Sequence, residues 1–137
     1  MLRSINVAGM LSFRDASLEL RPLNVLIGPN GSGKSNLIEI VALLQAAPRG
    51  LVQFFGKGGG IAEWLWKGER AGLPHEASGQ VDVVIDHPHK TAPLRYSLRV
   101  TARDHRLEIL NERLEYEKPS PGKVVPYYFF QVENGFG

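Results

Sequence analysis

Short runs in which apolar and polar residues alternate dominate both ends of the chain. Residues 2–7 and 13–20 alternate in this way, as half-buried strands do, and predict an N-terminal hairpin. Short turns, two with proline and one at Asp104 and His105, separate four later strand-like runs, at 81–86, 94–101, 107–116 and 124–132. Short links favour an antiparallel meander, because parallel strands need long crossover connections.

Two segments between these regions do not alternate. Residues 23–27 form a continuous apolar run, which predicts a buried strand. Residues 36–47 are apolar on nearly all sides and are followed by Pro48. That pattern predicts a helix buried between two layers. We therefore expect residues 1–47 to contain the hairpin, the buried strand and the helix.

The remaining chain completes a single domain. Residues 48–80 are rich in glycine and irregular, and only residues 61–67 are long enough for a helical turn or two. Residues 81–137 form the predicted antiparallel β region. A length of 137 residues allows one domain with a real core but not two of ordinary size. The overall expectation is an α/β fold with an antiparallel β subdomain.

A glycine-rich motif joins the predicted strand to the predicted helix. It matches the pattern G-x-x-x-x-G-K-[ST] in full, in the strand–loop–helix context that a phosphate-binding loop requires. Glycines let the backbone curl around phosphates, and the helix start adds unpaired N–H groups. The predicted nucleotide-binding residues are Gly28, Pro29, Asn30, Gly31, Ser32, Gly33, Lys34, Ser35 and Asn36.

Two side chains of this motif have distinct predicted roles. Lys34 is placed to reach the β- and γ-phosphates of a nucleoside triphosphate. The Ser35 hydroxyl is placed to ligate Mg²⁺. ATP and Mg²⁺ are accordingly the predicted cofactors.

Composition narrows the class of protein further. Hydrophobic residues make up 43% and charged residues 22%, which is typical of a soluble globular chain. No apolar run approaches the roughly 20 residues of a membrane span, and there is no cysteine for disulfides or thiolate metal sites. We therefore expect a cytoplasmic protein. The net charge of +2 permits contact with DNA but does not indicate it, since Lys and Arg are scattered along the sequence.

The order of hairpin, phosphate-binding loop, helix and antiparallel β region resembles the N-terminal lobe of the RecF/SMC branch of ABC-type ATPases. The wording G-P-N-G-S-G-K-S-N is similar to that branch's own loop, and residues 2–5 and 12–15 resemble its opening. Residues 9–11 stand where members of the branch usually have basic and aromatic residues before the turn. Within it, the chain looks most like small AAA_21 or RecF-like ATPases.

The resemblance implies a site completed by other parts. In that branch ATP is held between two heads, and a C-terminal lobe supplies the signature loop and the Walker B acids. A glutamine at the lobe junction completes the Mg²⁺ and water site; Gln131 is the best-placed candidate here. The chain would then be an incomplete ATPase head, whose partners are ATP, the missing lobe, and a second copy, with DNA or another protein as a further candidate.

Two other interpretations stay open at this level. Asp86 follows three apolar residues and could be a Walker B carboxylate of a different small NTPase or kinase, although His87 stands where a glutamate is usual. The chain could also be a stand-alone module that binds ATP without turnover. His87 and His89, next to Asp86, could be drawn as a metal site, but no fourth ligand is visible in the sequence.

Overall fold

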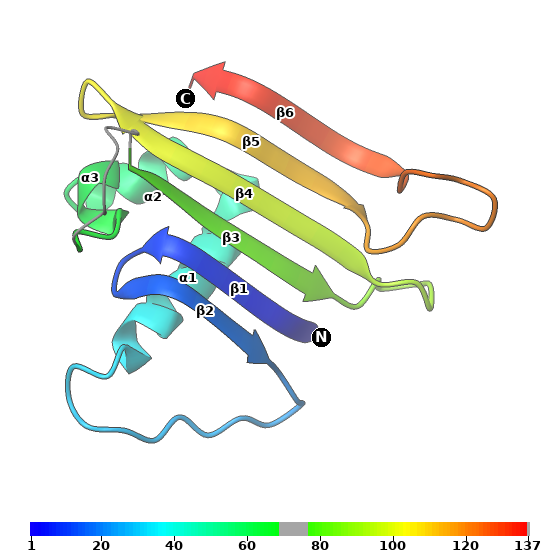
Figure 1. Cartoon of the computed structure of the whole chain (residues 1–137), viewed down its shortest axis with the longest axis horizontal. Helices are drawn as coiled ribbons and strands as arrows, with labels where there is room; N and C mark the ends of the chain where they lie inside the picture. The colour runs from blue at the N-terminus through cyan, green and yellow to red at the C-terminus, as the bar shows by residue number, and fades with distance from the viewer. Residues whose placement is uncertain (69–76, 137) are drawn as a thin grey trace.

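Six strands form one antiparallel sheet in the computed structural model, which describes residues 1–68 and 77–136 (Figure 1). The spatial order is β2-β1-β3-β4-β5-β6. The strands are β1 (Leu2–Met10), β2 (Phe13–Glu19), β3 (Ser78–Ile85), β4 (Leu94–Arg103), β5 (Arg106–Tyr116) and β6 (Tyr128–Phe136). The predicted hairpin and the predicted antiparallel region are both confirmed, and β1 pairs with β3 to join them in a single sheet.

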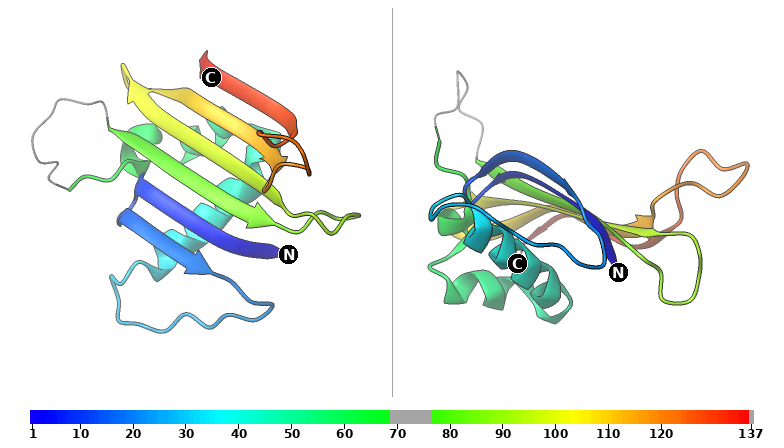
Figure 2. Two further views of the ribbon diagram at one scale, coloured as in Figure 1. Left: turned by 45° about the vertical axis from the view of Figure 1, so that its right-hand side comes forward. Right: turned by 90° about the horizontal axis from the view of Figure 1, so that it is seen from below.

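The helices all lie on one face of this sheet (Figure 2). They are α1 (Lys34–Ala46), a 3-10 turn (Ala47–Arg49), α2 (Leu51–Lys57) and α3 (Ile61–Trp64). The hydrophobic core lies between that face and the helices. Its largest fully buried side chains include Phe55, Ile5, Met10, Ile40, Leu43, Ile61 and Leu98.

The predicted strand at residues 23–27 is wrong for this structure. The segment between β2 and α1 has no strand, and its apolar side chains are exposed, with Leu23 at 81%, Val25 at 73% and Ile27 at 91%. A strand requires a neighbour to take its backbone hydrogen bonds. None of the six strands in the described ranges pairs with this segment.

Helix α1 is confirmed, but its predicted burial on all sides is wrong. Leu37, Ile40 and Leu43 are buried and pack in the core, as their spacing of three residues on one helix face allows. On the opposite side Ile38 is 63% exposed. The helix is therefore covered by a single layer, although its sequence has the apolar character of a helix between two layers.

An ion-pair cluster fixes the start of β1 to the end of β3. The Asp86 carboxylate accepts a hydrogen bond from Arg3 Nε at 2.5 Å and lies 3.1 Å from the amino group of Met1. The backbone N–H of Asp86 donates to the Met1 carbonyl at 2.8 Å. The hydrogen bond from Arg3, followed by that from the amino group, lowers the pKa of Asp86 below its usual 3.8.

This lowered pKa predicts an acid-sensitive contribution to stability. The contribution is fully present above pH 3.8, the unfolded-state value, and is lost as the pH falls through the lower folded-state pKa of Asp86. Asp86→Asn should therefore lower the free energy of unfolding at about pH 7, and this difference should shrink as the pH falls below 3.8 and through the folded-state pKa of Asp86. Urea unfolding across this pH range measures it; an effect of the substitution that stays constant with pH would contradict the assignment.

Candidate functional site

The glycine-rich loop forms a tight curve that ends at the start of α1. Gly31 and Gly33 have φ of +83° and +93°, the left-handed region in which a side chain is strained. The N–H of Ser32 donates to the Pro29 carbonyl at 3.3 Å and closes a turn inside the loop. Gly33 is the N-cap of α1. The sequence needs glycine at these two places for the loop to reach the helix in this shape.

The loop is pressed against the turn between β1 and β2. A Cβ on Gly33 would lie 3.2 Å from Ser12 Oγ and 3.5 Å from a ring carbon of Phe13. Asn36 Nδ2 donates to Ser12 Oγ at 2.7 Å, one helical turn further on. These contacts fix the start of α1 to the end of the hairpin. The hydrogen bond between Ser12 and Asn36 is not visible in the sequence, because the two residues are 24 positions apart.

The ammonium group of Lys34 lies inside the curve of the loop. Its Nζ donates to the Gly28 carbonyl at 2.5 Å and to the Pro29 carbonyl at 2.7 Å, and it is 3.2 Å from Ser32 Oγ. Three backbone or hydroxyl oxygens therefore hold one positive charge at the centre of the loop. The same three donors of the ammonium group could serve an anionic ligand.

The first turn of α1 adds further positive character. No side chain caps it, and it contains no acidic residue. Its first N–H groups have no carbonyl within the helix to receive them, and the helix dipole is positive at this end. Ser35 is exposed in this turn, with a hydroxyl of the kind that binds Mg²⁺. The loop, the helix start and Lys34 together suit a phosphate group, and Ser35 suits its metal ion.

Asp86 and Gln131 are not brought to the loop. Asp86 contacts Met1 at one end of β1, whereas Gly33 lies beside Ser12, just past the other end. The nine residues of β1 separate them by about 26 Å. The Asp86 carboxylate therefore lies far from the loop in this structure, and its role as a Walker B acid stays a prediction that these positions do not favour.

Gln131 lies on the outermost strand of the sheet. Its strand β6 is four positions from β1, about 19 Å at the usual strand spacing. The side chain donates from Nε2 to Glu133 at 2.6 Å. Within the chain as described, Gln131 therefore has a partner on its own strand and no contact with the loop.

The two histidines after Asp86 form no metal centre. Across residues 1–68 and 77–136, no group of three or more His, Cys, Asp or Glu side chains is placed to hold a metal ion. The N–H of His89 donates to Nδ1 of His87 at 3.0 Å, and the His87 ring stacks on Tyr116. Both are therefore part of a turn beside an aromatic ring.

The family follows from a profile that covers the loop, the helices and four of the six strands. The profile described as "AAA domain, putative AbiEii toxin, Type IV TA system" (AAA_21) matches residues 23–136. The chain belongs to the AAA_21 family. The match begins just before the loop and includes β3 to β6, so the predicted resemblance to AAA_21 ATPases is confirmed.

Two curated proteins are similar to about two thirds of this AAA_21 chain. It is 35% identical over 96 residues to the sulfate/thiosulfate import ATP-binding protein CysA of Halalkalibacterium halodurans, covering 66% of the chain and 24% of that protein. It is 29% identical over 98 residues to the chromosome partition protein Smc of Mycolicibacterium paratuberculosis, covering 70% and 8%. The chain thus spans a quarter or less of each relative's length.

A solved structure shares the fold. It comes from work on ATP-driven dimerization and DNA-stimulated activation of SMC ATPases, and it superposes with a TM-score of 0.54 at 19% identity. The match covers 79% of this chain and 67% of the solved one. The predicted mixed α/β fold with an antiparallel β region is confirmed. No helix in the described part of the chain is long and apolar enough to cross a membrane.

The contact between Ser12 and Asn36 is expected to stabilise the loop through one hydrogen bond. Ser12→Ala and Asn36→Ala should each lower the free energy of unfolding by about 1 kcal/mol, with a coupling of about 0.5–1 kcal/mol in the double variant. Urea unfolding of the four proteins measures it. Asn30→Ala, at an exposed loop position, is the matched control; strictly additive effects of the first two substitutions would show that the residues act independently.

Proposed function

We propose that the loop at residues 28–36 binds Mg·ATP. The observation that carries the proposal is the Lys34 ammonium group held inside a glycine curve, directly before an uncapped helix of 13 residues. A triphosphate would find backbone donors, a helix dipole and a lysine converging on one small volume. Ser35, in the first helical turn, would provide the hydroxyl ligand for Mg²⁺.

We further propose that the chain is one lobe of an ABC/SMC-like ATPase and hydrolyses ATP only when a C-terminal lobe and a second head complete the site. Exposed apolar surface supports this. Leu23, Val25 and Ile27 are exposed apolar residues in the unpaired segment leading into the loop, and Ile38 is exposed on α1. Apolar side chains left open to solvent in this way are available for contact with a further lobe or a second head. The carboxylate and glutamine candidates of this chain both lie away from the loop, which is consistent with binding without turnover.

Calorimetric titration of the 137-residue chain with ATP, with and without Mg²⁺, tests the first proposal. We expect saturable binding that is stronger with Mg²⁺ and weaker in Ser35→Ala. Phosphate release measured on the same samples separates a binding lobe from a complete enzyme: we expect no steady-state turnover. Absence of ATP binding by a folded chain would refute the proposed nucleotide site. Turnover by the chain alone would refute only the proposal that hydrolysis requires a C-terminal lobe and a second head.

A further inference from the structure

The chain's net charge is concentrated at the end of the sheet farthest from the loop. Two turns meet there: residues 87–93, between β3 and β4, and residues 117–127, between β5 and β6. We call them the distal turns. They contain three lysines and one glutamate, a formal charge of +2 that equals the net charge of the whole chain. The formal charges of all other residues sum to zero. Lys and Arg are scattered along the sequence, so this local excess of positive charge is not visible there.

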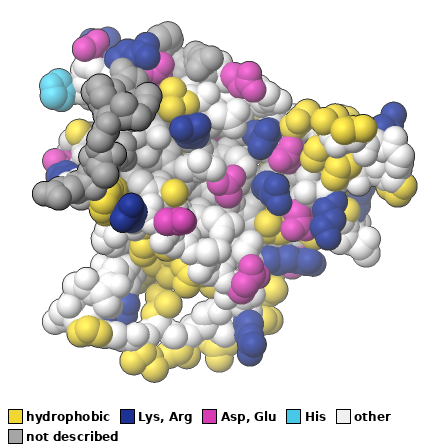
Figure 3. Space-filling model, in the orientation of Figure 1, with side chains coloured by type: hydrophobic (Ala, Val, Ile, Leu, Met, Phe, Trp, Pro, Cys, Tyr) yellow, Lys and Arg dark blue, Asp and Glu magenta, His cyan; other side chains and the backbone are white. Residues whose placement is uncertain are grey.

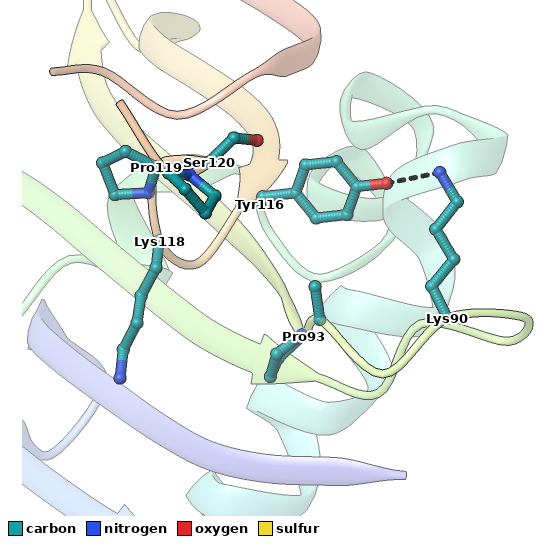
Figure 4. A pocket seen from close by; sticks show the side chains of 8 residues that line it. Lys90, Pro93, Tyr116, Lys118, Pro119 and Ser120 are labelled. Atoms are coloured by element: carbon teal, nitrogen blue, oxygen red, sulfur yellow. Dashed lines mark hydrogen bonds between the residues drawn. The ribbon is translucent and has the colours of Figure 1, made fainter. Parts of the chain in front are cut away.

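One backbone hydrogen bond joins the two distal turns: the N–H of Glu117 donates to the Pro93 carbonyl at 2.9 Å. A second closes the base of the longer turn, where the N–H of Tyr116 donates to the Tyr127 carbonyl at 3.1 Å. A cavity of about 480 Å³ lies between them, lined by Lys90, Ala92, Pro93, Tyr116, Lys118, Pro119, Ser120 and Pro121 (Figure 4). The prolines restrict the backbone conformations of the residues that line the cavity. This restriction lowers the conformational entropy that the turns would lose when a ligand binds.

Aromatic rings form one side of this region. The ring of Tyr116 stacks with His87 at 6.1 Å between centroids and meets the edge of Phe129 at 5.0 Å. Tyr127 packs edge-on against Phe129 at 5.1 Å. Tyr127 is nevertheless 63% exposed and Phe129 46% exposed. The cluster holds its rings in place while leaving ring surface open to a ligand.

Three lysines lie in the distal turns. Lys90 Nζ donates to the Tyr116 hydroxyl at 2.8 Å, a neutral partner that leaves the lysine's charge intact (Figure 4). Lys118 and Lys123 are exposed in the second distal turn. The space-filling view shows hydrophobic and basic side chains next to each other at this end of the molecule (Figure 3).

We propose that the distal turns bind single-stranded nucleic acid. Lysines beside accessible aromatic rings match a strand whose phosphates are anionic and whose unpaired bases can stack. A duplex satisfies the charge but keeps its bases within its own stack, so it would leave the rings unused. The surface is separated from the nucleotide loop by the length of the sheet (Figure 1). The proposal therefore goes beyond ATP binding and does not depend on it.

Fluorescence anisotropy of a fluorescein-labelled oligo-dT of roughly 20 nucleotides, titrated with the full chain at several salt concentrations, tests the proposal. Tyr127→Ala should weaken binding by about 5- to 150-fold, the range expected for one stacked base. Lys118→Ala combined with Lys123→Ala should reduce the slope of log affinity against log salt by about 1.4. Tyr127→Phe, which keeps the ring, should retain binding.

Matched variants distinguish binding at the distal turns from nonspecific charge attraction and from lipid binding. Lys57→Ala removes an exposed lysine at the end of α2 and should not alter oligonucleotide affinity. Tyr127→Leu keeps an apolar side chain but removes the ring, and should bind as poorly as Tyr127→Ala. The proposal is overturned if the oligonucleotide does not bind at low salt, if Lys57→Ala weakens binding as much as the distal lysines do, or if Tyr127→Leu retains binding and vesicles of anionic lipid compete for the site.

Discussion

Replacement of Lys34 with alanine is expected to weaken Mg·ATP binding by at least about 100-fold, because it removes two or more hydrogen bonds from a charged donor. The ammonium group already lies within the curve of the loop, between the carbonyls of Gly28 and Pro29. A triphosphate entering that curve would meet this charge before any other side chain charge of the loop. Without it, backbone N–H groups alone would remain to face several anionic oxygens.

Lys34→Arg should also bind poorly, since a planar guanidinium does not reproduce a compact ammonium between two carbonyls. Lys57→Ala, on the exposed end of α2, is the control and should bind as the parent does. Calorimetry gives the affinities, and circular dichroism shows that each variant is folded. If Lys34→Ala binds Mg·ATP within about threefold of the parent, the loop is not the nucleotide site.

The sequence allowed prediction of the elements whose causes are local. Residues 28–36 form a tight curve before a helix, and the glycines that allow this curve can be recognised in the sequence. Alternation likewise predicted the strand at residues 81–86, which overlaps β3, because alternate residues of that strand are buried. The strand at 23–27 failed for the opposite reason. An apolar run indicates a buried strand, but burial requires a neighbouring strand, and none pairs with residues 23–27 among the described residues.

Features that depend on tertiary contacts were not predictable. Helix α2 lies in a glycine-rich stretch that reads as irregular, and burial of Leu51 and Phe55 against the core stabilises it. The contact of Ser12 with Asn36 spans 24 residues. The distal turns collect their lysines from two stretches of chain separated by β4 and β5, so their shared charge appears only after folding.

Phe55→Ala is expected to have the largest effect on stability, about 3–5 kcal/mol of unfolding free energy. Its side chain is 1% exposed, and its ring meets Trp64 edge-on at 5.3 Å and Phe54 at 5.6 Å. Truncation would remove a large apolar group and leave a cavity where α2 and α3 cover the sheet. For a chain of 137 residues, the melting temperature should fall by roughly 10–20 °C.

Val52→Ala on the same helix is the matched control, because Val52 is 51% exposed. It should change the free energy of unfolding by no more than about 0.5 kcal/mol. Urea unfolding followed by tryptophan fluorescence and by circular dichroism measures both variants. Because Trp64 lies against Phe55, coincident transitions by the two probes would show that the aromatic cluster unfolds with the sheet. A loss below about 1 kcal/mol for Phe55→Ala would mean that α2 does not cover the core as the contacts indicate.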